Sequence, residues 1–119
     1  MDEVFAVTGP CSVNLLADLP SATSGEVFTE VLVRGGCRVE RIVSNGQVTP
    51  IDEPYCQGWD EWVLVLAGVA RIAVEGSEMI LAVGDHLLIP AGASHRVTFT
   101  DPTQATVWLA LHFDGSSNA

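Results

Sequence analysis

The chain has 119 residues, enough for one domain, and its 15 acidic and five basic residues give a formal net charge of −10. This charge argues against nucleic acid or an anionic membrane as the main partner, because both are bound by clustered cations. All five basic residues are arginine, so a Schiff-base lysine and a Walker-type phosphate lysine are excluded.

Residues 1–25 are predicted to form a short N-terminal arm. The pairs Gly9-Pro10, Leu19-Pro20 and Ser24-Gly25 interrupt it, and Asn14–Leu19 favours one short turn of helix. The start of the chain has neither the basic region nor the long apolar stretch of a signal peptide. We therefore expect a cytoplasmic protein.

The three cysteines are predicted to be free thiols. Cys11, Cys37 and Cys56 are an odd number with no C-x-x-C pair, so the sequence offers neither a zinc knuckle nor a thioredoxin-like motif. Free thiols are the usual state of cysteine in the cytosol.

From Glu26 onward, short runs rich in β-branched residues alternate with Gly, Asn-Gly and Pro turn signals. The predicted strands are Val27–Val33, Cys37–Ser44, Glu61–Ala67, Ala70–Glu75, Glu78–Val83, His86–Ile89, His95–Thr100 and Ala105–Phe113. No window keeps a 3.6-residue period, so the pattern predicts an all-β sandwich or barrel over residues 26–113. The small polar tail, 114–119, is predicted to be flexible.

The run Trp62–Leu66 (WVLVL) is apolar at every position, so both of its faces should be covered. One face is expected to pack into the barrel, and the other needs a second sheet, the N-terminal arm or another subunit. We expect a homodimer on this basis.

The most specific motif is the segment 84–95, which reads GDHLLIPAGASH. It resembles the second motif of the cupin superfamily, G-x5-P-x-G-x2-H, at every specified position through His95. That motif continues to an Asn where this chain has Phe99. Upstream, Glu61 and Gly68 are similar to the E-x6-G half of the first cupin motif, but its H-x-H half is replaced by Tyr55 and Gln57.

The resemblance implies a double-stranded β-helix, or jelly roll, that is often dimeric and has a cavity between its sheets. It also implies a divalent metal held by two His and a Glu of the first motif and one His of the second. Three imidazoles and a carboxylate suit Fe, Mn, Ni or Zn, whereas a Gln carbonyl in place of an imidazole makes a weaker site. The resemblance therefore implies an atypical metal site formed by Gln57, Glu61 and His95.

Strand parity supports a pocket. Tyr55, Gln57 and Glu61 share one parity, so they face one side if the segment is extended. The same rule groups His95, Val97 and Phe99 on an inward face, and Thr106, Trp108, Ala110 and His112 on another. We expect Tyr55, Trp108 and His112 to line a ligand pocket, with His112 as a second imidazole.

Two main functions remain open at this stage. One is a small metal-dependent isomerase, lyase or dioxygenase; the alternative is a non-catalytic cupin that lost its metal and binds or senses a small organic ligand. A structural subunit is a third possible function.

Acidic residues near Glu61, namely Asp52, Glu53 and Asp60, predict a negative pocket mouth that favours a cation. Arg38 or Arg41 could reach an anionic ligand, although a salt bridge with Glu40 explains an arginine there equally well.

Overall fold

The computed structural model describes residues 12–116, and eight strands account for its regular structure, with no helix in that part of the chain. The strands are β1 (Val27–Arg34), β2 (Gly36–Ser44), β3 (Asp60–Ala67), β4 (Ala70–Val74), β5 (Ser77–Leu81), β6 (His86–Ile89), β7 (His95–Thr100) and β8 (Thr106–Ser116). All eight predicted strands are present, with ends that differ by up to three residues.

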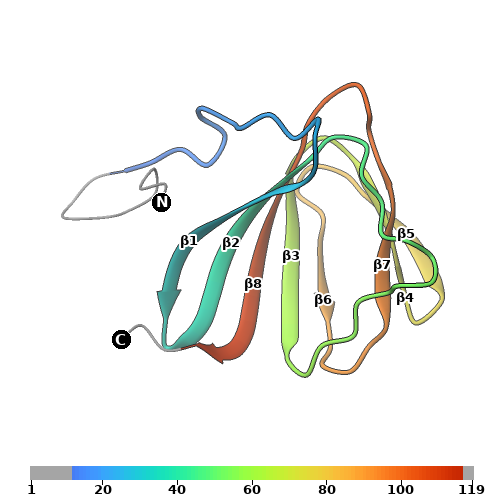
Figure 1. Ribbon diagram of the computed structural model, residues 1–119. Helices are drawn as coiled ribbons and strands as arrows, with labels where there is room; N and C mark the ends of the chain where they lie inside the picture. Colours follow the sequence, from blue (N-terminus) through green and yellow to red (C-terminus); the bar gives the residue numbers. More distant parts are fainter. Residues whose placement is uncertain (1–11, 117–119) are drawn as a thin grey trace.

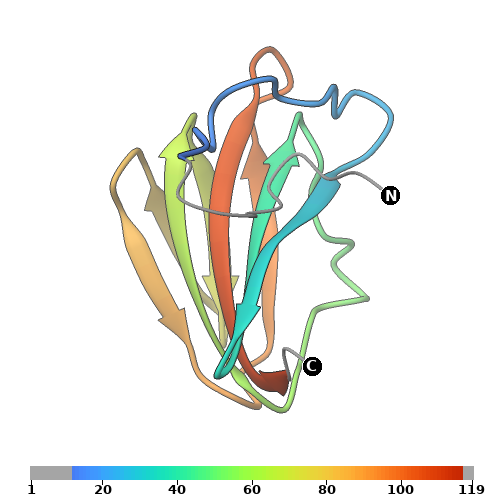
Figure 2. The same cartoon turned by 90° about the vertical axis from the view of Figure 1, so that its left-hand side faces the viewer.

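The strands form two antiparallel sheets that face each other (Figure 1). The larger sheet has the order β1-β2-β8-β3-β6, and the smaller has the order β5-β4-β7. Figure 2 shows the broad face of the larger sheet, with residues 12–25 crossing one end of its strands. The predicted all-β jelly roll is confirmed.

The segment before β1 differs from the expected turn of helix. Asn14 instead closes a tight turn, accepting Ala17 N–H at its carbonyl and Leu16 N–H at its side chain. Asn favours such turns because its side chain competes for backbone donors. Residues 1–11, with Cys11, and residues 117–119 lie outside the described part of the chain. β8 continues through Ser116, past the expected barrel end at residue 113.

The hydrophobic core lies between the two sheets and consists of alternate strand residues. Its buried members are Val63, Val65, Ala70, Ile72, Leu81, Ile89, Trp108 and Ala110. β3 shows why the sequence folds this way: Val63 and Val65 are buried, while Trp62 and Leu64 on the opposite face are partly buried. The homodimer that would cover this outer face stays a prediction.

A β-bulge changes which residues of β7 face inward. Phe99 pairs with Arg71 and Val97 with Ile72, so Thr98 is the extra residue between two successive residues of β4. Phe99 consequently lies under the Arg71 guanidinium, 5.4 Å from its ring centroid, and Thr100 is buried instead. The expectation that Phe99 faces inward with His95 and Val97 is wrong, because alternation does not survive a bulge.

The N-terminal arm packs on the larger sheet through polar anchors. Arg41 is buried on β2 and donates to the carbonyl of Leu15 and to the Thr29 hydroxyl. The Gln47 amide donates to the carbonyl of Ala22, which is itself buried. Arg41 is therefore a structural residue. Within residues 12–116, no helix is long and apolar enough to cross a membrane.

Candidate functional site

A cavity of about 280 Å³ lies between the sheets. Its apolar wall consists of Ile42, Val63, Ile72, Ile89, Val97 and Trp108, and its polar groups belong to Glu26, Arg38, Glu40, Tyr55, Gln57, Glu61, His95 and His112. Phe28 and Trp59 complete the lining. The six residues that the sequence singles out for a metal or ligand site all line this one cavity.

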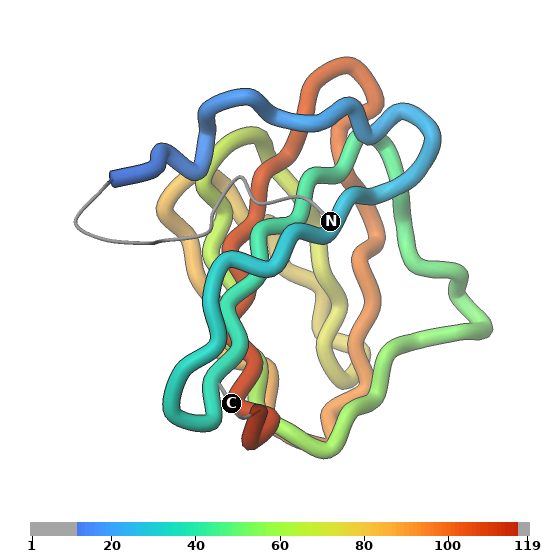
Figure 3. The backbone as a smooth tube through the Cα atoms, turned by 60° about the vertical axis from the view of Figure 1, so that its left-hand side comes forward, coloured from blue at the N-terminus to red at the C-terminus, as the bar shows by residue number. Residues whose placement is uncertain are grey.

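The segment between β2 and β3 forms a wide loop that leaves the sheets and then runs beside β7 (Figure 3). Backbone hydrogen bonds in both directions join Tyr55 to His95, at 2.8 and 2.9 Å, and Gly92 N–H donates to the Gln57 carbonyl at 2.7 Å. The Tyr55 ring stacks on the His95 ring with a 5.6 Å centroid separation. Backbone hydrogen bonds therefore hold the loop against the start of β7 and the turn before it, and the loop presents Tyr55 and Gln57 to the cavity.

His95 and Glu61 are two of the three buried polar residues of the cavity lining, with exposed fractions of 6% and 8%, and the third is His112. His95 Nδ1 lies 3.1 Å from the Ala93 carbonyl oxygen, which only accepts, so Nδ1 carries the ring proton. Nε2 of the neutral ring then has a lone pair, 3.8 Å from Glu61 Oε1. The same Oε1 accepts a 2.7 Å hydrogen bond from the Gln57 amide nitrogen.

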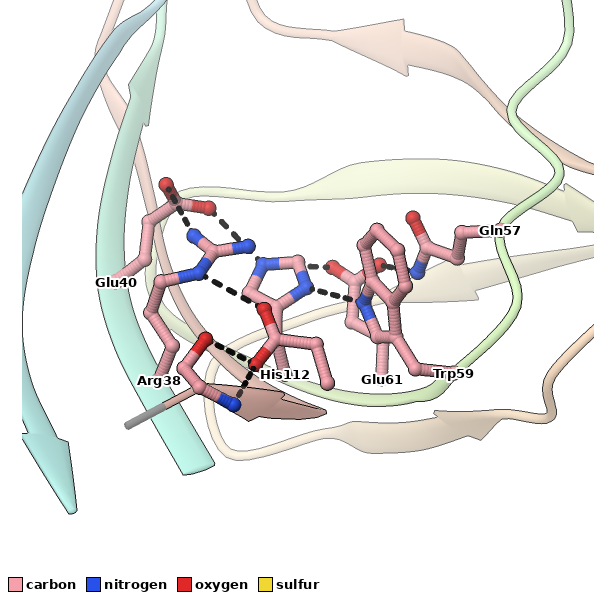
Figure 4. Close-up of polar contacts among 8 residues, drawn as sticks. Arg38, Glu40, Gln57, Trp59, Glu61 and His112 are labelled. Atoms are coloured by element: carbon pink, nitrogen blue, oxygen red, sulfur yellow. Dashed lines mark hydrogen bonds and ion pairs between the residues drawn. The ribbon is translucent and has the colours of Figure 1, made fainter. Parts of the chain in front are cut away.

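His112 is held in the opposite tautomer (Figure 4). The Trp59 indole N–H donates to His112 Nδ1 at 3.1 Å, so the proton of the neutral ring is on Nε2. Nε2 lies 3.1 Å from Glu40 Oε1 and 4.0 Å from Glu61 Oε2. His112 therefore donates to Glu40, lies too far from Glu61 for a hydrogen bond, and has its lone pair already used by Trp59.

His86, the third histidine, lies outside the cavity. It is exposed on β6 and accepts a 3.1 Å hydrogen bond from the Trp62 indole at Nδ1. Cys56 is also exposed and donates its thiol to the Gly92 carbonyl, away from the cavity lining.

The charge of Arg38 is neutralised within the protein. Its guanidinium contacts Glu40 Oε2 at 3.3 Å and Asp114 Oδ2 at 3.1 Å, and Figure 4 shows Arg38 beside Glu40. The carboxylates lining the cavity are Glu26, Glu40 and Glu61. Asp52, Glu53 and Asp60, expected to make the pocket mouth negative, are exposed and do not line the cavity, so that expectation is wrong for these three residues.

Asp114 gives this network a pH dependence. Hydrogen bonds from Ser116, and the nearby Arg38, lower the pKa of Asp114 from 3.8 to about 2. The ionised carboxylate therefore stabilises the folded state above pH 3.8, and this stabilisation is lost as the pH falls toward about 2.

We expect Asp114→Asn to lower the urea unfolding midpoint at pH 6, and to lower it less at pH 2.5. At pH 2.5 the wild-type carboxyl is largely protonated in the unfolded state and partly protonated in the folded state, so little of its stabilising effect is left to lose. Ser116→Ala, which keeps the charge but removes the hydrogen bond from the Ser116 hydroxyl to Asp114, should show a smaller gap of the same sign. An equal gap between wild type and Asp114→Asn at both pH values would contradict this assignment.

At the other end of the cavity, the Trp108 indole donates to the Ser44 hydroxyl at 3.1 Å, and that hydroxyl donates to Glu26. Burial of the phenol, with the carboxylates of Glu26 and Glu61 nearby, raises the pKa of Tyr55 above its ordinary value of 10.0. Tyr55 is therefore a phenol at neutral pH.

These contacts decide whether the residues fit the metal that the jelly-roll motifs imply. Tyr55 is not a phenolate, Gln57 turns its NH2 toward Glu61, and His112 Nε2 carries a proton. In residues 12–116 no group of three or more His, Cys, Asp and Glu side chains is arranged to hold a metal ion. Only His95 Nε2 and Glu61 remain as ligands, so these residues do not fit a resident transition metal in this arrangement.

Sequence reasoning missed Glu26, Phe28 and Glu40 as cavity residues, and for Arg38 it left open a contact with a ligand or a salt bridge with Glu40. Parity places Arg38 and Glu40 on one face of β2, together with Ile42. Only the register with β8, in which Arg38 is paired with His112, shows that this face lines the cavity. The structure shows that Arg38 pairs with Glu40 and also lines the cavity.

A family model described as the cupin domain matches residues 42–112, more than half of the chain. The chain belongs to the cupin domain family. This cupin is similar to a putative mannose-6-phosphate isomerase from Ralstonia eutropha JMP134, with 44% identity and a TM-score of 0.83 over 89% of this chain and 100% of the other. No curated protein sequence gives a significant match.

Two more distant structures share the fold of this cupin. A conserved protein of unknown function from Streptococcus pyogenes is 16% identical, with a TM-score of 0.74 over 98% of each chain. A cupin superfamily protein from Desulfitobacterium hafniense DCB-2 is also 16% identical, with a TM-score of 0.69 over 85% of this chain and 89% of the other. At these identities the likeness concerns the fold alone.

Proposed function

We propose that this cupin binds a small polar metabolite in the cavity between its sheets and transfers a proton to or from it, with His95 as the base, in a reaction of the isomerase class. The observation that carries the proposal is the burial of the His95 ring together with its tautomer. Its ring is 6% exposed, its Nδ1–H is bound to the Ala93 carbonyl, and its Nε2 lone pair faces the cavity. A general base needs this arrangement of a fixed tautomer and a free lone pair.

The neighbours of His95 suit the same role. When Nε2 takes up a proton the ring becomes an imidazolium, and the Glu61 carboxylate 3.8 Å away would stabilise that charge. The Gln57 amide holds Glu61 Oε1 in place, as a third group does in other catalytic arrangements. Glu61 is on this account a positioning and electrostatic residue rather than the base.

The cavity also fits a small substrate. Its volume of about 280 Å³ is near the lower end of the range for ligand sites, which suits a molecule of monosaccharide size or smaller. The Tyr55 hydroxyl adds a neutral donor or acceptor at the rim. The 44% identity to a protein named as a putative mannose-6-phosphate isomerase supports the reaction class.

A metal-dependent form of this function, with Mn, Fe, Ni or Zn, requires the Gln57 amide to turn so that its oxygen joins Glu61 and His95. Turning the amide would place the Gln57 carbonyl oxygen 2.7 Å from Glu61 Oε1, which is unfavourable unless a cation lies between the two oxygens. The assay below therefore includes protein treated with a chelator and protein supplied with each of these metals in turn.

The experiment follows carbon-bound hydrogen. Aldoses, ketoses and their amino and phosphorylated derivatives are incubated with the protein in D2O, and deuterium incorporation next to the carbonyl carbon is followed by NMR. We expect enzyme-dependent incorporation with chelator-treated protein. Binding of a compound without any exchange would instead favour the alternative of a non-catalytic binding or sensing cupin, which the replacement of both H-x-H imidazoles by Tyr55 and Gln57 supports.

A further inference from the structure

The deepest polar part of the cavity presents acceptors without matching donors. Glu61 and His95 are both more than nine-tenths buried and both line the cavity. In the described residues, no hydrogen-bond donor reaches His95 Nε2, and the donor closest to Glu61 Oε2 is His112 Nε2 at 4.0 Å. Gln57 supplies one N–H to Glu61 Oε1. An acceptor that a ligand covers without supplying a donor is costly, so a ligand of this cavity is expected to bring donors to Glu61 and His95.

The charges of the lining point to the kind of donor. The carboxylates of Glu26, Glu40 and Glu61 face the cavity, and Arg38, the cation among the lining residues, is already shared by Glu40 and Asp114. Glu26 has a neutral partner, the Ser44 hydroxyl. The cavity therefore has an excess of negative charge that the protein does not balance locally.

From these contacts we infer that the ligand of this cavity is a small amine whose ammonium group donates to Glu61 and lies beside His95 Nε2. This inference rests on the proposed function, because it names the substrate class of the same site. An ammonium group has three donors and no acceptor, which suits the two oxygens of the Glu61 carboxylate and leaves the His95 Nε2 lone pair to the neighbouring carbon of the ligand. The 3.8 Å between His95 Nε2 and Glu61 Oε1 lets two adjacent atoms of one ligand contact one group each.

The aromatic side chains at the rim of the cavity also favour a cationic ligand. Phe28 and Tyr55 are half-exposed and line the cavity, and Trp59 lines it deeper in the fold. Ring faces attract cations and repel anions. A phosphate ester would meet three carboxylates and an arginine that would have to leave two ion pairs, so the structure disfavours a phosphorylated ligand.

The test compares ligands that differ in charge and little else. D-glucosamine is paired with D-glucose, 2-amino-1,3-propanediol with glycerol, and glucose 6-phosphate is the anionic probe. Binding to chelator-treated protein is measured by calorimetry and by thermal shift at neutral pH. We expect at least one amine to bind, at least about tenfold tighter than its neutral partner, since a buried ammonium–carboxylate contact is strongly favourable.

Two variants test whether Glu61 is the carboxylate that binds the ammonium group of the ligand. Glu61→Gln keeps the size of the side chain and should weaken amine binding at least about tenfold while changing binding of the neutral partner little. Asp60→Asn, next to it but outside the cavity, is the matched control and should change neither. Thermal unfolding of both variants checks that each is folded.

The inference is overturned if glucose or glucose 6-phosphate binds as well as the amines, if no amine binds, or if amine binding appears only after a metal is added. The proposed function survives the first of these results, provided that the bound compound exchanges its carbon-bound hydrogen. It fails together with the inference only if no compound of any charge binds or exchanges.

Discussion

Replacing His95 by glutamine is expected to lower the rate of carbon–hydrogen exchange by about 10²–10⁴-fold, which is the usual contribution of a positioned general base. Glutamine retains an acceptor at a similar distance from the backbone, so ligand affinity should change by less than about tenfold. The loss therefore appears in the rate at saturating ligand, as expected for a group that acts in the transition state.

His86→Gln is the matched control for this substitution. His86 is exposed on β6 and contacts Trp62 outside the cavity, so exchange should be unchanged in that variant. Exchange by His95→Gln at the wild-type rate would remove His95 from the role of base. A rate that depends instead on added Mn, Fe, Ni or Zn would favour the metal-dependent form.

Replacing Gly68 by alanine is expected to destabilise the fold by about 2–5 kcal/mol. Gly68 connects β3 to β4 with φ of +80°, a conformation that costs an L-residue about 1–2 kcal/mol. An added Cβ would also lie 2.8 Å from the Ala105 carbonyl oxygen and from two atoms of Thr106. Thr106 is fully buried and its hydroxyl donates to the Val69 carbonyl, so it cannot easily move, and such overpacking adds about 1–3 kcal/mol.

Gly76→Ala separates these two contributions. Gly76 has nearly the same φ, +82°, but nothing lies within 4 Å of an added Cβ. This variant should therefore lose only the conformational part, about 1–2 kcal/mol. Urea unfolding of both variants measures the difference, and equal losses would show that the contact with Thr106 has no effect.

The two motifs predicted the fold because their spacing reflects backbone geometry. Gly68, the last residue of the first motif, is required by its φ and by the close approach of β8. In the second motif, Gly92 has φ of +81° and its N–H binds the Gln57 carbonyl, which joins the two motifs across the cavity. Turn chemistry of this kind is local in sequence, so sequence reasoning can reach it.

Other parts of the site depend on contacts between distant strands. The pairing of Arg38 with His112 places the Arg38–Glu40 ion pair against the cavity, and sequence parity alone does not choose that face. The bulge opposite Arg71 reverses the inward face of β7 at Phe99. Neither register nor bulge position is written in the local pattern, because both follow from the best packing of two strands.

The residues predicted to form the ligand site also combine features that the sequence predicts with contacts that only the fold determines. Tyr55, Gln57, Glu61, His95, Trp108 and His112 all line one cavity. Their hydrogen-bond partners, however, come from elsewhere in the fold: Trp59 orients His112, and Ala93 orients His95. These partners decide which ring nitrogens are free, and they are what changes the expected metal centre into an acceptor site for a ligand.

The most direct test of this account is the tautomeric state of the histidines, read from long-range ¹H–¹⁵N correlations in the ligand-free protein at neutral pH and assigned with single His→Gln variants. We expect His95 to carry its proton on Nδ1, leaving Nε2 bare, and His112 to carry its proton on Nε2. A His95 ring with its proton on Nε2 and a bare Nδ1 would contradict the account, because no free lone pair would then face the cavity.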